Sequence, residues 1–308
     1  MAARATRSAS SGGSPRHLLE LSHDALGVIV DGLADPLQPV VAVALSSTCL
    51  GLRTPLQVAL EVLKGRHERA VALCRLPGRG SCVGMRDATA LNFSVEGLIA
   101  DDMATLGMIL RTNGLPCLQN LWLQHNAFGD RGMQALCEGL GCGTAPSLRC
   151  LDLTGNQFGP AGAEALAAAL RGGAMPKLEE LDLSGLSEEL EHELQIGNNP
   201  IGNQGVAALG APLRMLPALK VLELSNCNIG DEGVASLVAD LGKDDFKALK
   251  KLWLDDNKIT DAGAAKLVAT IDAGGLPKLV DHDYFLKNNA ATAAALQGVS
   301  LALDKRSQ

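Results

Sequence analysis

Aromatic residues are scarce in this sequence: its 308 residues include five phenylalanines, two tryptophans and one tyrosine. A core built on large rings is therefore excluded, and 34 glycines among many alanines and leucines favour thin layers that repeat. No stretch approaches the roughly 18 consecutive apolar residues of a membrane-spanning helix, so we expect no membrane contact. Hydrophobic residues make up 47% of the chain and charged residues 20%, which excludes a wholly disordered chain.

Basic charge is scarce over most of the chain. The formal net charge is −7, and it is unevenly distributed. Residues 1–85 carry 9 Lys and Arg against 6 Asp and Glu, a net +3, whereas residues 86–308 carry 18 against 28, a net −10. Nucleic-acid-binding proteins need basic surface to displace counterions from phosphates. The acidic body of this chain therefore argues against a nucleic-acid partner.

Paired cysteine motifs are absent. None of the eight cysteines is spaced C-x-x-C, which excludes zinc knuckles and thioredoxin-type sites, and we expect no bound metal. Scattered cysteines in a long chain are typical of free thiols in a reducing compartment, so the cytoplasm is the expected location, with the nucleus as the alternative. No apolar stretch follows the basic start, so we expect no secretory signal. Residues 1–16 are rich in Ser and Arg and lack acids, which predicts a disordered tail, with a transit peptide as the alternative.

Enzyme motifs are missing as well. The chain has no G-x-x-x-x-G-K followed by Ser or Thr, and no H-E-x-x-H. The six histidines are scattered, and no cysteine or serine has a base near it in the sequence. We therefore expect neither a catalytic residue nor a cofactor, and the chain is not expected to be an enzyme.

A repeat dominates the second part of the chain. Four segments share the pattern L-x-x-L-x-L-x-x-N/C-x-I/F, followed by a glycine and then a leucine, at residues 115–136, 145–166, 216–237 and 246–267. The first half of each segment alternates with the period of a strand, and the second half has helical spacing. One such unit cannot bury its own apolar face, so the units must stack.

This pattern resembles leucine-rich repeats of the ribonuclease-inhibitor type, whose long repeat contains a true helix. The resemblance implies an α/β solenoid over residues 88–303, with parallel strands on the concave side, helices on the convex side and a short tail at 304–308. The asparagine column, in which Cys227 replaces one member, is expected to bond the backbone of adjacent repeats; it comprises Asn126, Asn156, Asn199 and Asn257. Four polar residues are each expected to cap the helix that follows them: Asp130, Asn203, Asp231 and Asp261.

One repeat is irregular. Residues 178–185 should run directly into 199–209, but thirteen residues, 186–198, lie between them and carry four glutamates. Either Leu181 and Leu183 form the strand and the insert loops out, or Leu194 and Ile196 form it, or both segments pair. The step of 30 residues from Leu151 to Leu181 favours the first interpretation.

The region before the repeats differs in kind. Residues 17–75 predict a small helical module, and residues 76–87 predict a linker. Residues 21–53 resemble an F-box in the positions Leu21, Asp24, Leu26, Ile29, Leu33, Asp35, Pro36, Leu45, Cys49 and Arg53, although Ser22 replaces the usual proline and the usual tryptophan after the cysteine is missing. The resemblance implies that an adaptor subunit of a cullin-type ubiquitin ligase contacts Leu21, Leu26, Ile29, Leu33, Pro36 and Leu45. The alternative is a helical cap that closes the first repeat.

One position in each predicted strand faces the open side of the sheet. Along the array this column reads Asn92, Trp122, Asp152, Asp182, Glu223, Trp253 and Asp283. Neighbouring positions add His125, Asp255 and Asp256. The negative charge of this face is partly offset by Lys220, Lys250 and Lys251. Both tryptophans of the chain fall in this column with three acids between them. Tryptophan is enriched in binding hot spots, although a ring can also simply cover its neighbours.

These observations predict a protein–protein interaction module that binds a partner with a basic segment on its concave face. The narrower hypothesis is a substrate receptor of a cullin-type ubiquitin ligase. The alternative is a ribonuclease-inhibitor-like or GTPase-activator-like regulator of a bound enzyme.

Overall fold

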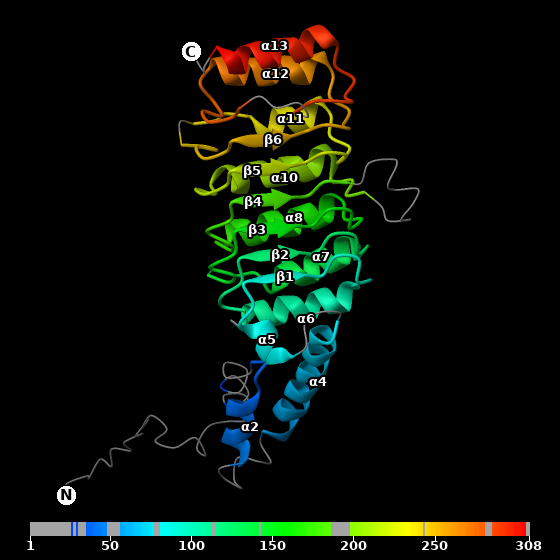
Figure 1. Ribbon diagram of the computed structural model, residues 1–308, viewed down its shortest axis with the longest axis vertical. Coiled ribbons are helices and arrows are strands. Elements are labelled where there is room, and N and C mark those ends of the chain that lie inside the picture. Colours follow the sequence, from blue (N-terminus) through cyan, green and yellow to red (C-terminus); the bar gives the residue numbers. More distant parts are fainter. Residues whose placement is uncertain are drawn as a thin grey trace, which may run out of the picture.

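Short strands and helices alternate along most of the chain and stack along the long axis of the molecule (Figure 1). The computed structural model describes residues 26, 29, 35–47, 56–76, 81–112, 115–141, 143–185, 198–242, 244–280 and 285–305. The strands are β1 (Ala90–Asn92), β2 (Asn120–Trp122), β3 (Cys150–Asp152), β4 (Glu180–Asp182), β5 (Val221–Glu223) and β6 (Lys251–Trp253). The helices of the stack are α6 (Ala100–Arg111), α7 (Gly129–Glu138), α8 (Pro160–Arg171), α10 (Gly202–Arg214), α11 (Asp231–Leu237), α12 (Asp261–Asp272) and α13 (Ala293–Asp304).

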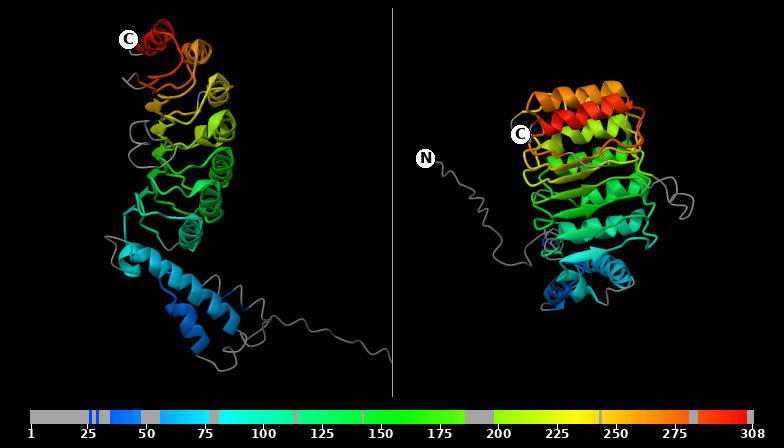
Figure 2. Two further views of the ribbon diagram at one scale, coloured as in Figure 1. Left: turned by 90° about the vertical axis from the view of Figure 1, so that its right-hand side faces the viewer. Right: turned by 45° about the horizontal axis from the view of Figure 1, so that its top comes forward.

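The strands form one parallel sheet in the order β1-β2-β3-β4-β5-β6. The middle residue of each strand is a leucine, and each of these leucines is at most 2% exposed; in register they are Leu91, Leu121, Leu151, Leu181, Leu222 and Leu252. Figure 2 shows the strands on one side of the stack and the helices on the other, with the helices on the outside of the bend. The predicted α/β solenoid with a helical region before it is confirmed.

The irregular repeat uses its first candidate strand. β4 contains Leu181 and pairs directly with both β3 and β5, which leaves no place for another strand between them. Leu194 and Ile196 lie outside the described residues. The Asn199 amide donates to the carbonyls of Leu183 and Ser184, both at 3.1 Å, just as the Asn156 amide donates to those of Leu153 and Thr154 in its own repeat. The thirteen inserted residues therefore leave the contacts of Asn199 unchanged.

The asparagine column joins successive repeats, as expected. The Asn156 amide donates to the Leu123 carbonyl of the preceding repeat at 2.9 Å, and its Oδ1 accepts from the backbone N–H of Asn126 at 2.9 Å. The same pattern of donation across a repeat recurs at Asn126, Asn199, Asn257 and, in the last repeat, Asn289. The Cys227 thiol also donates to the preceding repeat, at 3.2 Å from the Leu183 carbonyl. Each of these buried polar groups is satisfied only when two repeats are stacked.

The expected helix caps are present, but their assignment to helices was wrong. Asp130 lies inside the first turn of α7, and its Oδ1 accepts from Gly159 and Gly162 at the start of α8, both at 2.7 Å. Asp231 of α11 likewise accepts from Thr260 and Gly263 of α12. Each carboxylate thus caps the helix of the next repeat, because parallel stacking brings that helix start alongside it.

Glycine makes this close approach possible. A Cβ on Gly162 would lie 2.9 Å from Oδ1 of Asp130, and one on Gly263 would lie 2.5 Å from Oδ1 of Asp231. The glycine of the repeat pattern therefore leaves room for the cap from the neighbouring repeat. Pro160 occupies the corresponding position in α8 and has no side-chain acceptor, so α10 receives no such cap.

The helical region before the sheet contains α2 (Val40–Ser47), α4 (Gln57–Cys74) and α5 (Cys82–Arg86). Helix α5 lies within the segment predicted as a linker, and its Met85 is 1% exposed. Leu37, Leu73 and Met85 belong to the same buried cluster as Leu91 of β1. The region therefore covers the apolar edge of the first repeat.

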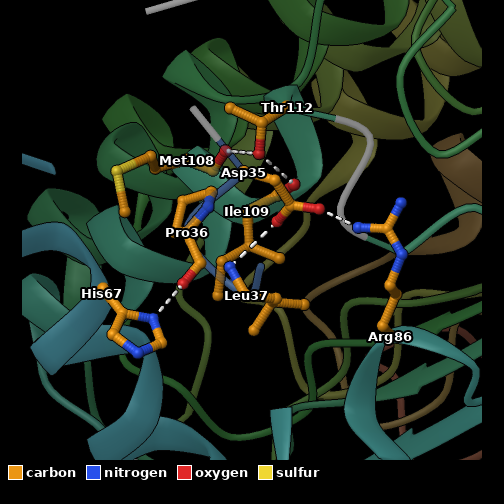
Figure 3. A network of polar contacts seen from close by, with 8 residues as sticks. All are labelled: Asp35, Pro36, Leu37, His67, Arg86, Met108, Ile109 and Thr112. Carbon is orange, nitrogen blue, oxygen red and sulfur yellow. Dashed lines mark hydrogen bonds and ion pairs between the residues drawn. The ribbon is translucent and has the colours of Figure 1, made fainter. Parts of the chain in front are cut away.

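Polar contacts hold the segment 35–37 in place (Figure 3). Asp35 forms an ion pair with Arg86 and accepts from the backbone N–H of Leu37. Nδ1 of His67 in α4 lies 2.7 Å from the Pro36 carbonyl. These contacts connect the start of the helical region to both α4 and α5.

The cross-repeat caps predict which helix a cap mutation destabilises. Asp231→Ala should lower the free energy of unfolding by about 1 kcal/mol, because the donors at the start of α12 lose their acceptor. Hydrogen exchange should accelerate at Thr260 and Gly263 more than within α11. The control is Glu232→Ala, an exposed neighbour that bonds only Asn203, at 3.4 Å. Faster exchange confined to α11 would contradict the assignment.

Candidate partner-binding face

The column identified in the sequence is one continuous row on the sheet. The register aligns Asn92, Trp122, Asp152, Asp182, Glu223 and Trp253. We call the five residues from Trp122 to Trp253 in this alignment the concave row. Strands lie about 4.8 Å apart, so four strand spacings separate the two tryptophans by about 19 Å.

The structure differs from the predicted column in two places, one in exposure and one in alignment. Trp122, Asp152, Asp182 and Trp253 are half-buried, but Glu223, expected to be open to solvent, is only 6% exposed. In the last repeat, the Leu254 N–H bonds the Phe285 carbonyl, just as the Leu224 N–H bonds the Trp253 carbonyl. Phe285, which is buried, therefore aligns with Trp253, and the prediction of Asp283 in this position was wrong; Asp283 itself lies outside the described residues.

A second row of hydroxyl groups supports the acids. Thr154 donates to Asp152 at 2.7 Å, and Ser184 donates to Asp182 at 2.6 Å. The hydroxyl groups of Thr154 and Ser184 lie 3.3 Å apart. Sequence reasoning missed this row, although its signal is present as a Ser or Thr two residues after each acid of the concave row.

Glu223 and Asp255 share one hydroxyl group. Both carboxyl groups are within hydrogen-bond distance of the Ser225 hydroxyl, which has only one proton to donate. The second carboxyl contact is favourable only if that carboxyl carries a proton of its own, which it then donates to the Ser225 oxygen. The structure therefore brings Glu223 and Asp255 together in an arrangement that favours protonation of one of them.

Burial is the main reason why the pKa values of Asp182, Glu223 and Asp255 are raised. Desolvation, with the Asp152 charge added, raises the pKa of Asp182 to about 6. Desolvation also raises the pKa of Glu223 to about 8, where Asp182 and Asp255 add to the shift and the Ser225 hydrogen bonds oppose it. Asp255 is shifted upward as well, again mainly because burial raises its pKa.

Two cations neutralise Glu179 beside the row, but none of the described cations pairs with an acid within it. Glu179 forms ion pairs with both Arg149 and Lys220, and these partners lower its pKa. Among the described residues, no lysine or arginine forms an ion pair with Asp152, Asp182 or Glu223. The row therefore carries carboxyl groups that lack a cationic partner within the described chain.

His125 and Asp256 lie in the turns that follow β2 and β6, and the structure does not bring them together. His125 has a left-handed backbone with φ of 61°, and its buried Nδ1 has no hydrogen-bond partner. Desolvation lowers the pKa of His125, and the nearby charge of Asp152 opposes this shift. Asp256 accepts from the Asn288 amide at 2.8 Å, at the opposite end of the row.

Two of the six expected adaptor-binding residues are buried. Leu26 is 2% exposed and Pro36 is buried, so neither can contact a partner in this conformation, and Ile29 is half-buried. Leu21, Leu33 and the side chain of Leu45 lie outside the described residues. The apolar surface that is exposed instead consists of valines between 47% and 76% exposed: Val40, Val41 and Val43 of α2, and Val58 and Val62 of α4.

Three further features bear on chemistry. In the described part of the chain, no group of three or more His, Cys, Asp or Glu side chains is placed to hold a metal ion. Its six cysteines are free thiols. None of its helices combines the length and the apolar character needed to cross a membrane.

The raised pKa of Glu223 predicts a pH-dependent stability. A pKa of about 8 instead of 4.5 means that, between these values, the folded chain keeps a proton that the unfolded chain has released. The free energy of unfolding should therefore fall as the pH rises from about 5 to about 8. Glu223→Gln should remove much of this fall in thermal melts, with Glu180→Gln, at an exposed position of β4, as the control. Identical pH profiles for Glu223→Gln and the native chain would contradict the assignment.

The repeats also match a known family. The family described as Leucine Rich repeat matches residues 114–137, 144–167, 192–210, 217–238 and 248–268. No curated protein shows significant similarity to the chain. The third match begins within the insert and continues through Asn199 into α10, whereas the strand of that repeat is β4. Together with the parallel sheet and its asparagine column, these matches show that the chain is a leucine-rich repeat protein, with the matched repeats spread across residues 114–268.

Proposed function

We propose that this protein binds another protein on the concave sheet face, and that the partner contributes a basic segment. Leucine-rich repeats commonly serve as scaffolds for protein–protein interaction, which supports the general part of this proposal. The observation that carries the specific part is the lack of a cationic partner for Asp152 and Asp182 among the described residues. Both carboxyl groups are half-buried, and a lysine or arginine of a partner would supply the missing pair.

The two tryptophans supply apolar anchors at the ends of the acidic part. Each ring is half-buried, so each keeps apolar area that a partner can cover. A partner that spans both anchors has to cross four strand spacings, about 19 Å, which an extended segment of about six residues can do. The proposed binding mode is thus an extended basic segment that lies across the strands.

Trp122→Ala and Trp253→Ala should each weaken partner binding by about 2 kcal/mol or more, because buried tryptophans dominate interface energetics. Affinity capture with mass spectrometry identifies the partner, and titration calorimetry then measures the loss for each variant. Met215→Ala, at a position 77% exposed and away from the row, is the control. The melting temperatures should stay near that of the native chain. Unchanged affinity in both tryptophan variants would remove the concave row from the proposal.

We further infer that the helical region contacts a second protein, and that the chain is a substrate receptor of a cullin-type ubiquitin ligase. The F-box-like sequence pattern and the five exposed valines of α2 and α4 support this narrower function. The burial of Leu26 and Pro36 means that the valines, and not these two residues, form the contact. If the captured partner were instead an enzyme whose activity changes on binding, the protein would be a regulator of that enzyme.

Co-purification of the full chain with a cullin-type adaptor subunit tests this second contact. Val41→Asp and Val62→Asp should abolish co-purification, because a charge placed in an apolar interface must be desolvated. Val95→Asp, at an equally exposed position beside the first repeat, is the matched control and should retain the adaptor. Failure of the native chain to retain the adaptor would refute the ligase function and leave the concave-face proposal intact.

A further inference from the structure

A groove runs between α4 of the helical region and α6 of the first repeat. Its volume is about 360 Å³, and it is lined by Arg69, Asp101, Ala104, Thr105, Met108 and Arg111. The described parts of both helices pack into one buried cluster, so two ordered elements form the walls. Both walls of the groove are helices, whereas the concave row lies on the strands of the sheet, so the two surfaces are built from different elements.

Two arginines in the groove have no counter-ion. Arg69 and Arg111 form no ion pair within the described chain, whereas Arg86 and Arg149 each pair with a carboxylate. Among the described residues that line the groove, Asp101 is the only acid. It lies ten residues before Arg111 on the same helix, about 15 Å away along the axis. The described lining therefore carries two guanidinium groups against one carboxylate, a net positive charge.

The other lining residues indicate which chemical groups the ligand carries besides the anion. Ala104 and Met108 provide an apolar strip between Asp101 and Arg111, and the Thr105 hydroxyl already donates to the Asp101 carbonyl. A ligand that fills the groove therefore combines a strongly anionic group with an adjacent apolar group. A free inorganic anion would leave the apolar strip uncovered.

We propose that this groove binds a partner segment carrying phosphoserine or phosphothreonine next to an apolar residue. A phosphate on a side chain carries a charge of about −1.5 to −2, which matches two guanidinium groups better than a single carboxylate does. Arginine also binds phosphate through paired, charge-assisted hydrogen bonds. The apolar neighbour of the phosphoresidue covers Ala104 and Met108. This site acts independently of the concave face.

The test uses the full chain and three degenerate libraries of nine-residue peptides, in which the central residue is fixed as phosphoserine, serine or glutamate. The native protein should retain the phosphoserine library and neither of the others. Arg69→Gln and Arg111→Gln should each weaken binding of the retained peptides about tenfold, as measured by fluorescence anisotropy, because each removes a charge-assisted contact. Arg131→Gln, an exposed arginine of α7 outside the groove, is the matched control and should bind like the native chain.

Asp101→Asn distinguishes a change in the groove from a loss of folding, because it should raise the affinity for peptide. Removing this negative charge from the groove should tighten binding of the phosphoserine peptides, whereas a variant that fails to fold only loses binding. Equal retention of the serine or glutamate library would overturn the proposal. Native affinity in the Arg69→Gln, Arg111→Gln double variant would overturn it as well, because the phosphate would then bind elsewhere on the chain.

Discussion

The structure depends on hydrogen bonds that buried backbone groups of one repeat can form only with side chains of a neighbouring repeat. Each asparagine of the column donates to carbonyls of its own repeat and of the preceding one, so no repeat completes its buried hydrogen bonds alone. The leucine of each strand has the same dependence, because it is buried only when a repeat, or the helical region beside Leu91, covers each side of it. Stability in such an array is a sum of nearest-neighbour terms, and the caps that reach from one helix to the next add to each term.

The same constraint creates the candidate binding face. Because the register is fixed at the leucines, the residue after each leucine must align with its equivalents in the neighbouring strands. Acids in this position are therefore forced into adjacent places, where like charges repel one another and burial adds to the cost. Thr154, Ser184 and Ser225 offset part of this cost within the chain. The row is accordingly less favourable for folding alone than a neutral row would be, as is common at sites shaped for a partner.

The periodicity of the sequence predicted the features that the repeat pattern itself determines. It placed the strands, the buried leucines, the asparagine column and the aligned row, since all of these follow from a 30-residue pattern with one face to bury. It failed where the outcome depends on tertiary packing. Asp130 lies at the start of its own helix in sequence, but only stacking shows that its carboxylate reaches α8. Phe285 replaced the expected Asp283 because Asn289 follows Asn257 by 32 residues rather than 30, and the burial of Pro36 depends on distant contacts with α4.

The junction at Gly185 and Asn199 has a consequence for how the molecule can change. Asn199 forms the hydrogen bonds of a regular repeat although the thirteen-residue insert directly precedes it. The stacking of the repeats therefore does not depend on the length of the segment inserted at this point. A tolerant junction in the middle of a rigid scaffold is a natural graft point. A peptide tag, a reporter or an entire second domain could be carried there, level with the acids of the concave face, while the repeats on both sides keep their stacking.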